Sequence, residues 1–438
     1  MQRYSKPTQC PRNWRGMALI AIGIVLIAFS ALTAQGAVAA TPPQYFVDET
    51  KLPFTSLAGT ETTTLWGVHG GAGYRIEVPD NWNGDLVLYA HGFRGAGLEL
   101  TVSNPSIRAY LIANGYAWAA SSYATNGYDV AQGVKDTHDL GKLFNGKVGN
   151  PDRTYIMGHS MGGHITGVLA EQHARTYAGA LPMCGVMGDN ELFDYFVDFH
   201  LIAQAITGIS APHPFPADYA TATIPQLKAA LAGAFPLALN ADGLALKAAT
   251  INISGGARPL TDVAWVFWAN FLFTTGLSFD EGSVENENTV YQLDSDPALS
   301  AEEQLLNDTI QRISLDPQSR HPNGLGGIPA ISGNIRIPVL SLHTLGDLFV
   351  PFSMEQIYAQ RVSDYGKSNL LVTRAIRDVG HCGFTPLEQE NAFVDLVNWV
   401  ENGVKPAGDA VLDPAVVAGP NFGCAFTTTK RAYAPACP

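Results

Sequence analysis

Cysteine, charge and long apolar runs are all scarce in this chain of 438 residues. Only 15% of the residues are charged, and acidic residues outnumber basic ones by 39 to 26. This acidic balance argues against nucleic acid and against anionic membrane surfaces as partners. No cysteine and histidine pair has the spacing of metal ligands, so we expect no metal site. Internal repeats and low-complexity tracts are absent from the sequence as well.

The N-terminal segment holds the apolar run that comes nearest to the length of a membrane span. It combines a basic stretch without acids, the apolar segment Met17–Leu32 and the small residues Ala37–Ala40. This pattern predicts a secretory signal peptide over residues 1–40. An uncleaved anchor is the alternative, but the run is somewhat short for a span of about 20 residues. We therefore expect a secreted or periplasmic protein without a stable membrane anchor. Cleavage would take the net charge from −13 to −17.

Strand-like and helix-like segments alternate after residue 85. We expect helices at 106–113, 130–144 and 162–175 between strands at 86–90, 116–121, 153–157 and 179–184. Such alternation predicts an α/β fold with a mostly parallel, doubly wound sheet covered by helices. The alternation stops near residue 186 and resumes at 337, with further strands near 337–342 and 370–376.

The gap of about 150 residues in this alternation is too long for a loop. We expect a core made of residues 41–185 and 337–403, a helical lid or cap over 186–336, and a tail over 404–438. Helices are expected in the insertion at Asn190–Ile209, Ile224–Leu239 and Leu260–Leu277. Its many aromatic residues either cover the site as an apolar lid that excludes water or form the core of the cap itself.

Four cysteines follow the predicted signal peptide: Cys184, Cys382, Cys424 and Cys437. An even number in an exported protein suggests two disulfides, with three possible pairings. Cys424 and Cys437 lie close together in the tail, and a bond between them would staple it. Cys184 and Cys382 should both lie at the C-terminal edge of the sheet, so their pairing is plausible. A free, buried Cys184 is the alternative.

The segment Gly158-His159-Ser160-Met161-Gly162 lies between an expected strand and an expected helix. This G-x-S-x-G spacing is typical of a nucleophile elbow, in which a sharp turn exposes the serine hydroxyl at the sheet edge. The turn requires small residues on both sides of Ser160, and Gly158 and Gly162 supply them. The free N–H groups of the helix N-terminus favour developing negative charge. A glycine-rich turn with a chance serine is the alternative interpretation.

A serine nucleophile needs a base, and the base needs an acid that fixes its tautomer. Asp347 and His381 each follow an expected strand, in the order serine, acid, histidine that this type of fold uses. Asp378 is a rival acid close to His381. Three other histidines compete for the role of base, but they occupy the variable elbow position, the following helix and a strand: His159, His164 and His343.

An oxyanion hole is also expected. The segment His91-Gly92-Phe93-Arg94-Gly95 follows the early strand at 86–90. In enzymes with a nucleophile elbow, one oxyanion donor is the N–H after the nucleophile, and the other comes from the loop after this strand. These donors would be the backbone amides of Met161 and Phe93.

In this combination of motifs the chain resembles the α/β-hydrolase superfamily, over roughly residues 65–185 and 335–402. The resemblance implies that Ser160 is the nucleophile, Asp347 the acid and His381 the base. It implies a reaction class rather than a substrate, because the superfamily includes esterases, lipases, amidases, peptidases, thioesterases and acyltransferases.

The chain is similar to feruloyl esterases and tannases in one feature, the cysteine directly after the histidine. Those enzymes also carry a cysteine just before the nucleophile, where this chain has His159. We therefore do not place the chain in that family.

We expect an exported serine hydrolase that cleaves a carboxylic ester, small or polymeric, through an acyl-enzyme on Ser160. This chemistry needs no metal or organic cofactor. An amidase or peptidase, or an acyltransferase, would use the same residues. A non-catalytic binding protein on a hydrolase scaffold is a further alternative, against which the intact serine, aspartate and histidine argue.

Overall fold

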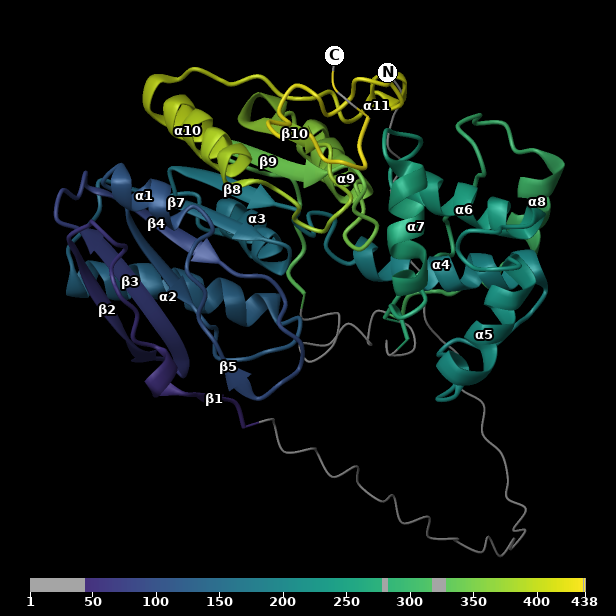
Figure 1. The fold of residues 1–438 in the computed structure, drawn as a ribbon, viewed down its shortest axis with the longest axis horizontal. Coiled ribbons are helices and arrows are strands. Elements are labelled where there is room, and N and C mark those ends of the chain that lie inside the picture. The colour runs from purple at the N-terminus through teal and green to yellow at the C-terminus, as the bar shows by residue number, and fades with distance from the viewer. Residues whose placement is uncertain (1–43, 278–282, 317–327, 436, 438) are drawn as a thin grey trace, which may run out of the picture. The chain divides into compact units, whose positions relative to one another are not determined.

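The computed structural model describes residues 44–277, 283–316, 328–435 and 437. The predicted signal peptide lies outside the described residues. Figure 1 shows a central sheet with helices packed on it, and a group of helices that the chain inserts between two of the sheet strands. Within the described ranges, no helix has both the length and the apolar character that crossing a membrane requires.

The central sheet is built from β2 (Thr62–His69), β3 (Ala72–Pro79), β4 (Asp85–Ala90), β6 (Ala117–Ser121), β7 (Arg153–His159), β8 (Gly179–Met183), β9 (Val339–Thr344) and β10 (Leu371–Ile376). Across the sheet the strands run in the order β10-β9-β8-β7-β4-β6-β3-β2. Neighbours are parallel except at β2–β3 and β3–β6. The mostly parallel α/β sheet predicted from the sequence is therefore confirmed. A short parallel pair, β1 (Phe46–Val47) and β5 (Glu99–Leu100), lies apart from it.

Helices cover both faces of the sheet: α1 (Arg108–Ala113), α2 (Val130–Lys147), α3 (Met161–Gln172), α9 (Ser353–Asp364) and α10 (Pro386–Asn402). All six residues of β4 are buried. Successive side chains of a strand point to opposite faces. Leu88 accordingly packs among residues of α2 and α3, whereas the next residue, Tyr89, packs among residues of α1 and α10. Burial on both faces explains why the sequence of this strand is a continuous apolar run.

The helices between β8 and β9 form a second apolar core: α4 (Glu191–Thr207), α5 (Tyr219–Leu231), α6 (Ala241–Ile253), α7 (Thr261–Leu272) and α8 (Ala301–Thr309). The predicted helices Asn190–Ile209 and Leu260–Leu277 correspond to α4 and α7. The predicted helix Ile224–Leu239 is wrong at its end, because the chain leaves α5 at Leu231 and turns into α6.

Two helices of the insertion were not predicted, although each begins with a recognisable cap. The side chain of Asn240 accepts a hydrogen bond from the amide of Gly243 at the start of α6. Ser300 and Glu303 form a capping box at the start of α8. Helix α6 shows weak apolar periodicity and α8 is mostly polar, and the caps are the local signal that could have revealed them.

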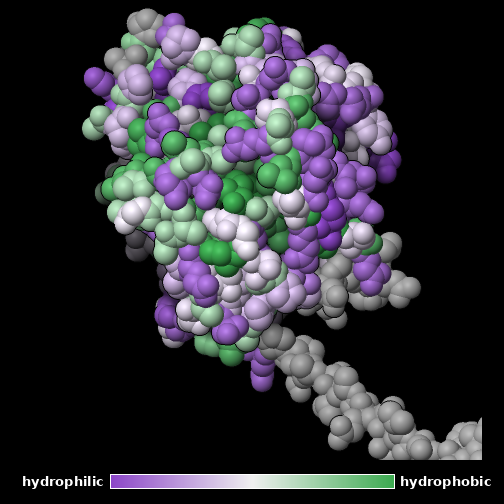
Figure 2. All heavy atoms as spheres, turned by 90° about the vertical axis from the view of Figure 1, so that its right-hand side faces the viewer, coloured by the Kyte–Doolittle hydropathy of each residue, from purple (hydrophilic) through white to green (hydrophobic). Residues whose placement is uncertain are grey.

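The aromatic residues of α7 are divided between the inside and the outside of the insertion. Trp265 is 1% exposed and packs in the core of the insertion, whereas Phe267 and Phe271 are 57% and 38% exposed. Figure 2, which views the side of Figure 1 on which the insertion lies, shows hydrophobic residues gathered among hydrophilic ones. Some aromatic residues of α7 therefore belong to the core of the insertion, and others lie on its surface.

The tail continues the core at the edge of the sheet. The backbone amide of Asp409 donates to the carbonyl of Thr373 in β10, and its carboxylate accepts from the amide of Ala375. These bonds cover part of an edge strand that would otherwise be exposed. Beyond them lie the short helix α11 (Pro414–Val417) and a disulfide between Cys424 and Cys437.

Candidate active site

Ser160 occupies a sharp turn between β7 and α3. Its backbone has φ 58° and ψ −121°, a conformation that non-glycine residues rarely adopt outside functional sites. A side chain at position 158 would collide with the carbonyl of Gly162, and one at 162 would collide with the carbonyl of Ala90. Both positions therefore require glycine, as the elbow motif predicts.

The loop after β4 runs directly past the serine. A Cβ atom on Gly92 would lie 3.1 Å from Cβ of Ser160 and 3.2 Å from the carbonyl oxygen of His159. Among the described residues, the backbone amides of Phe93 and Met161 donate to no protein acceptor. Two unpaired N–H groups close to a nucleophile are the arrangement that binds a developing oxyanion.

Asp347 and His381 are brought together by the loops that follow β9 and β10. Nδ1 of His381 lies 2.6 Å from Oδ2 of Asp347. The other oxygen of this buried carboxylate accepts hydrogen bonds from the amides of Phe349, at 2.9 Å, and Val350, at 3.0 Å. The backbone of its own loop thus holds the carboxylate in place.

The rival acid Asp378 is engaged elsewhere. One of its oxygens accepts from the amide of Gly380 at 2.7 Å, and the other from Nε of Arg431 at 2.7 Å. Arg431 comes from the tail and also bonds Glu388 at the start of α10. The tail therefore neutralises Asp378, and the hydrogen bond of His381 goes to Asp347.

The second ring nitrogen of His381, Nε2, is buried and has no hydrogen-bond partner among the described residues. In particular, no hydrogen bond there joins it to the Ser160 hydroxyl. With Nδ1–H directed at Asp347, Nε2 carries the lone pair that can accept a proton. Hydrogen bonds between nucleophile and base are often long before a substrate binds, so this arrangement is compatible with proton transfer from Ser160.

Parts of this chain are similar in sequence to known proteins. Residues 114–227, which include β7, Ser160 and α3, match the model described as the prolyl oligopeptidase family. An o-phthalyl amidase of Xanthobacter agilis is 23% identical over 425 residues, covering 83% of this chain and 92% of the amidase. The mostly parallel sheet with helices on both faces is an α/β-hydrolase fold, and these two matches support a serine hydrolase.

Solved structures similar to this α/β hydrolase include esterases and peptidases. Feruloyl esterase B from Aspergillus oryzae is 14% identical with a TM-score of 0.45, covering 80% of this chain and 85% of the esterase. Proline iminopeptidase of Mycobacterium smegmatis is 13% identical with a TM-score of 0.40, covering 78% of this chain and 99% of the peptidase.

The three histidines that compete with His381 each have a hydrogen-bond partner of their own. His159 lies between the hydroxyl of Tyr89, at 3.3 Å, and the amide oxygen of Gln389, at 3.1 Å, and burial lowers its pKa to about 4. In the same way, His164 meets the Tyr128 hydroxyl and a backbone carbonyl. His343 is fully buried in β9 and faces the carbonyl of Val350 at 2.8 Å. Of these three rings, His343 also faces a carboxylate, with 3.7 Å between its Nδ1 and Oε2 of Glu355, which is longer than the 2.6 Å between His381 and Asp347.

A disulfide lies directly against this site. Cys184, which follows β8, is bonded to Cys382, which follows His381. The two sulfurs and a ring nitrogen of His381 lie within 4.8 Å of one another, the kind of cluster that can hold a metal ion. Here both sulfurs are used in the disulfide, so no thiolate remains as a ligand. The cluster therefore braces the histidine loop rather than offering a metal site.

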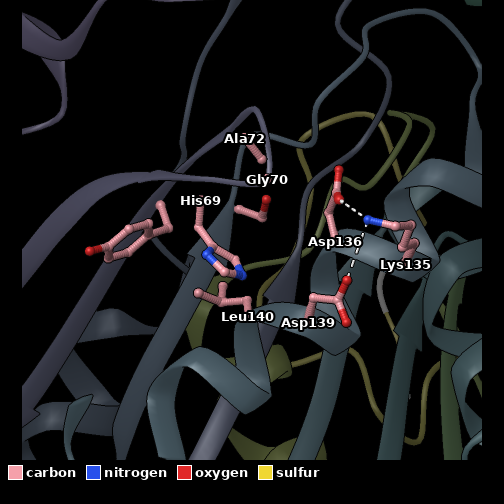
Figure 3. Close-up of a pocket in the computed structure, with 9 residues that line it drawn as sticks. His69, Gly70, Ala72, Lys135, Asp136, Asp139 and Leu140 are labelled. Atoms are coloured by element: carbon pink, nitrogen blue, oxygen red, sulfur yellow. Dashed lines mark ion pairs between the residues drawn. The ribbon is translucent and has the colours of Figure 1, made fainter. Parts of the chain in front are cut away.

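The small pocket shown in Figure 3 is separate from these residues. It has a volume of about 30 Å³ and lies between the turn joining β2 to β3 and helix α2. Lys135 is paired there with Asp136 and Asp139. No residue of the elbow, the acid loop or the histidine loop lines it. Its volume is that of about one water molecule, too small for a substrate.

Phe349 is a site residue that the sequence did not identify. Its ring lies edge-on to His381, with 5.1 Å between the ring centroids, and its amide holds Asp347. In the sequence, the only indication of this role was that Phe349 lies two positions after Asp347. Phe349 thus contacts both Asp347 and His381.

Proposed function

We propose that this α/β hydrolase cleaves carboxylic esters through an acyl-enzyme on Ser160. One observation carries the proposal: His381 is hydrogen-bonded to the buried Asp347 while its second nitrogen is buried and unpaired. Neutral His381 takes the proton as Ser160 Oγ attacks the ester carbonyl carbon. Asp347 holds the ring in the correct tautomer and stabilises the imidazolium that results.

The remaining steps use the same few groups. The negative charge on the tetrahedral oxygen is met by the amides of Phe93 and Met161, each worth about 2.7–4 kcal/mol in comparable sites. His381 then gives its proton to the leaving alcohol oxygen as the bond from carbon to that oxygen breaks. A water molecule attacks the acyl-enzyme while His381 takes a proton from it. His381 then returns that proton to Oγ of Ser160 as the bond from the acyl carbon to Oγ breaks and the acid leaves.

Residues 186–336 are proposed to act as a lid. Phe349, which contacts His381, stacks on Phe196 of α4 at 5.8 Å and meets Phe271 of α7 at 5.0 Å. The indole N–H of Trp268 donates to the carbonyl of Val379 at 2.7 Å, two residues before the base. These contacts support an aromatic wall over the site. Such a wall favours an aromatic or long aliphatic acyl group and excludes water.

Amide cleavage is the second candidate, and one observation favours it. The relative whose alignment covers 92% of its own length and 83% of this chain is named an o-phthalyl amidase. The same residues can cleave an amide if His381 protonates the leaving nitrogen before the bond breaks. The aromatic acyl group in that name agrees with the aromatic wall proposed for this chain.

A panel of matched substrates separates the two candidates. The chain without residues 1–40 is given p-nitrophenyl esters and the corresponding p-nitroanilides, with acetyl, octanoyl, palmitoyl and benzoyl groups. We expect ester hydrolysis that favours benzoyl over acetyl and that is lost in Ser160→Ala. Anilide cleavage at a comparable rate would make the protein an amidase. Ester cleavage that persists in Ser160→Ala would refute the acyl-enzyme.

Export through the signal peptide over residues 1–40 belongs to the same proposal. Both disulfides, Cys184–Cys382 and Cys424–Cys437, support it because such bonds persist in oxidising compartments. Mass spectrometry of the protein recovered outside the cytoplasm tests the cleavage. A mature N-terminus near residue 41 is expected, and an intact N-terminus would point to an anchor instead.

A further inference from the structure

The loop that supplies the Phe93 amide also carries a cation. Arg94 comes directly after Phe93, two residues after the glycine whose backbone touches Ser160. Its guanidinium is anchored by the segment after β5. One nitrogen donates to the carbonyl of Thr101 at 2.5 Å and to its hydroxyl, and the other donates to the hydroxyl of Ser103. The partners of Arg94 are thus neutral oxygens.

Arg94 has no carboxylate partner among the described residues. No aspartate or glutamate oxygen there lies within the 4.0 Å limit of an ion pair with its guanidinium. Arg108 is paired with Glu77, and Arg361 with Asp189. Arg75, Arg258 and Arg377 resemble Arg94 in having only neutral hydrogen-bond partners among the described residues, but none of them belongs to the loop that lies against Ser160. The chain has 39 acidic residues and only 26 basic ones, so an acidic neighbour would have been readily available. A guanidinium without a carboxylate partner can bind an anion through its remaining N–H groups.

The groups near this cation include His91, Tyr89 and a second guanidinium, that of Arg75. Burial lowers the pKa of His91 to about 4, with the charge of Arg94 acting in the same direction. Burial raises the pKa of Tyr89 to about 12, and the same charge opposes that shift. Tyr89 bonds His159, which precedes Ser160. The positive charge of Arg94 therefore acts on a residue next to the elbow, and no carboxylate among the described residues pairs with it.

Donor groups on Arg94 remain for a ligand. A guanidinium has five N–H groups, and the bonds to Thr101 and Ser103 use three of them. These bonds also hold the side chain in one position, so a ligand would not have to order it. A fixed guanidinium with spare donors fits a carboxylate, which accepts paired hydrogen bonds.

We propose that Arg94 is a specificity-determining residue that binds a carboxylate on the acyl group of the substrate. This inference rests on the proposed serine hydrolase function and narrows it. The substrate class is an ester or amide of an aromatic acid with a second, free carboxylate. The aromatic ring faces the wall around Phe349, the scissile carbonyl faces the amides of Phe93 and Met161, and the free carboxylate faces Arg94.

Binding to a protein that cannot turn over tests the inference independently of catalysis. In the Ser160→Ala background, calorimetry compares the monomethyl esters of the three benzenedicarboxylic acids with their neutral dimethyl esters. At least one monomethyl ester is expected to bind about 10-fold tighter than its dimethyl partner, the scale of a hydrogen bond to a charged group. Equal or weaker binding of all three monomethyl esters would overturn the inference.

Variants of Arg94 identify the group responsible. Arg94→Gln is expected to remove the preference for the charged ligand, and Arg94→Lys to retain much of it. Lys142→Gln, on the exposed surface of α2, removes one positive charge elsewhere and should leave the preference intact. If Arg94→Gln weakened the charged and the neutral ligand equally, Arg94 would merely hold the loop, and the inference would fall.

A fluorophosphonate probe on the protein with Ser160 distinguishes failure of this inference from failure of the proposed function. Labelling together with no charge preference would overturn the role of Arg94 alone. A charge preference in the binding assay without labelling would support Arg94 and overturn the hydrolase mechanism.

Discussion

Cys382 directly follows His381 and is bonded to Cys184, with 5.2 Å between the two Cα atoms. The bond ties the loop of the proposed base to the end of β8, the strand beside the elbow strand β7. Because 198 positions separate the two cysteines, the bond also removes much chain entropy from the unfolded state. One covalent link thus serves both the position of the base and the stability of the fold.

Removal of this disulfide is expected to lower kcat more than it raises KM. In Cys184→Ala/Cys382→Ala the histidine loop loses its brace, and a displacement of about 1 Å in such a group can cost about 10²-fold in rate. Steady-state kinetics on a p-nitrophenyl ester measure the effect. The tail pair Cys424→Ala/Cys437→Ala is the control, expected to lower the free energy of unfolding while changing kcat less. Equal effects of the two double variants on kcat would contradict a role in positioning His381.

Replacement of the acid tests the pairing of Asp347 with His381. Asp347→Asn leaves the size of the side chain unchanged but disfavours the required tautomer, and a loss of about 10⁴-fold in kcat is expected. Asp378→Asn is the matched comparison, because Asp378 bonds Arg431 and Gly380 rather than the base. If Asp378→Asn had the larger effect on kcat at unchanged stability, the assignment of the acid would be wrong.

The aromatic wall makes a prediction about the acyl group. Phe271→Ala removes a ring in contact with Phe349, and aromatic contacts of this kind are worth about 0.5–1.5 kcal/mol. KM for a benzoyl ester should therefore rise about 2–10-fold, whereas kcat/KM for an acetyl ester should change little. Phe267→Ala on the same helix is the control, since Phe267 is more exposed and its ring contacts Trp268 instead. A similar KM change in both variants would argue against a specific wall.

Asp198 in the insertion predicts a pH dependence of stability. Burial raises the pKa of Asp198 to about 7, although the Tyr291 hydroxyl donates to it at 2.6 Å. In the unfolded chain the pKa is near 3.9. The stabilising contribution of the protonated form is therefore complete below about pH 4 and is lost as the pH rises through about 7.

Asp198→Asn removes this titration and keeps an acceptor for Tyr291. Compared with the variant, the natural chain should lose stability between pH 5 and pH 8. Urea unfolding of both proteins at the two pH values measures the difference. A difference in the free energy of unfolding that does not change with pH would contradict the raised pKa.

The core of the fold was predictable because its signals are local. The apolar run of β4 and the glycines at 158 and 162 each reflect a requirement that a few neighbouring residues satisfy. The same holds for the elbow at Ser160, where the allowed backbone and the collisions around Gly158 and Gly162 leave little choice.

The rest depends on contacts between distant parts of the chain. From the sequence alone, Asp347 and Asp378 were competing candidates for the acid. In the structure, Asp378 accepts a hydrogen bond from Arg431, which lies 53 positions away in the chain. The contact of Phe271 with Phe349 likewise joins the insertion to the acid loop. In the insertion, α6 was missed because its apolar periodicity is weak, and α8 was missed because it is mostly polar. The caps at Asn240 and Ser300 were the local indications of these helices.

The most direct test of the proposed mechanism is the mass of the protein after treatment with a fluorophosphonate probe. The chain without residues 1–40 should gain the mass of one probe, located by peptide mapping on the segment that contains Ser160. Ser160→Ala should gain none, and Asp347→Asn should react much more slowly. A folded protein that stays unlabelled, or a Ser160→Ala variant labelled as fully as the natural chain, would contradict the assignment of Ser160 as nucleophile.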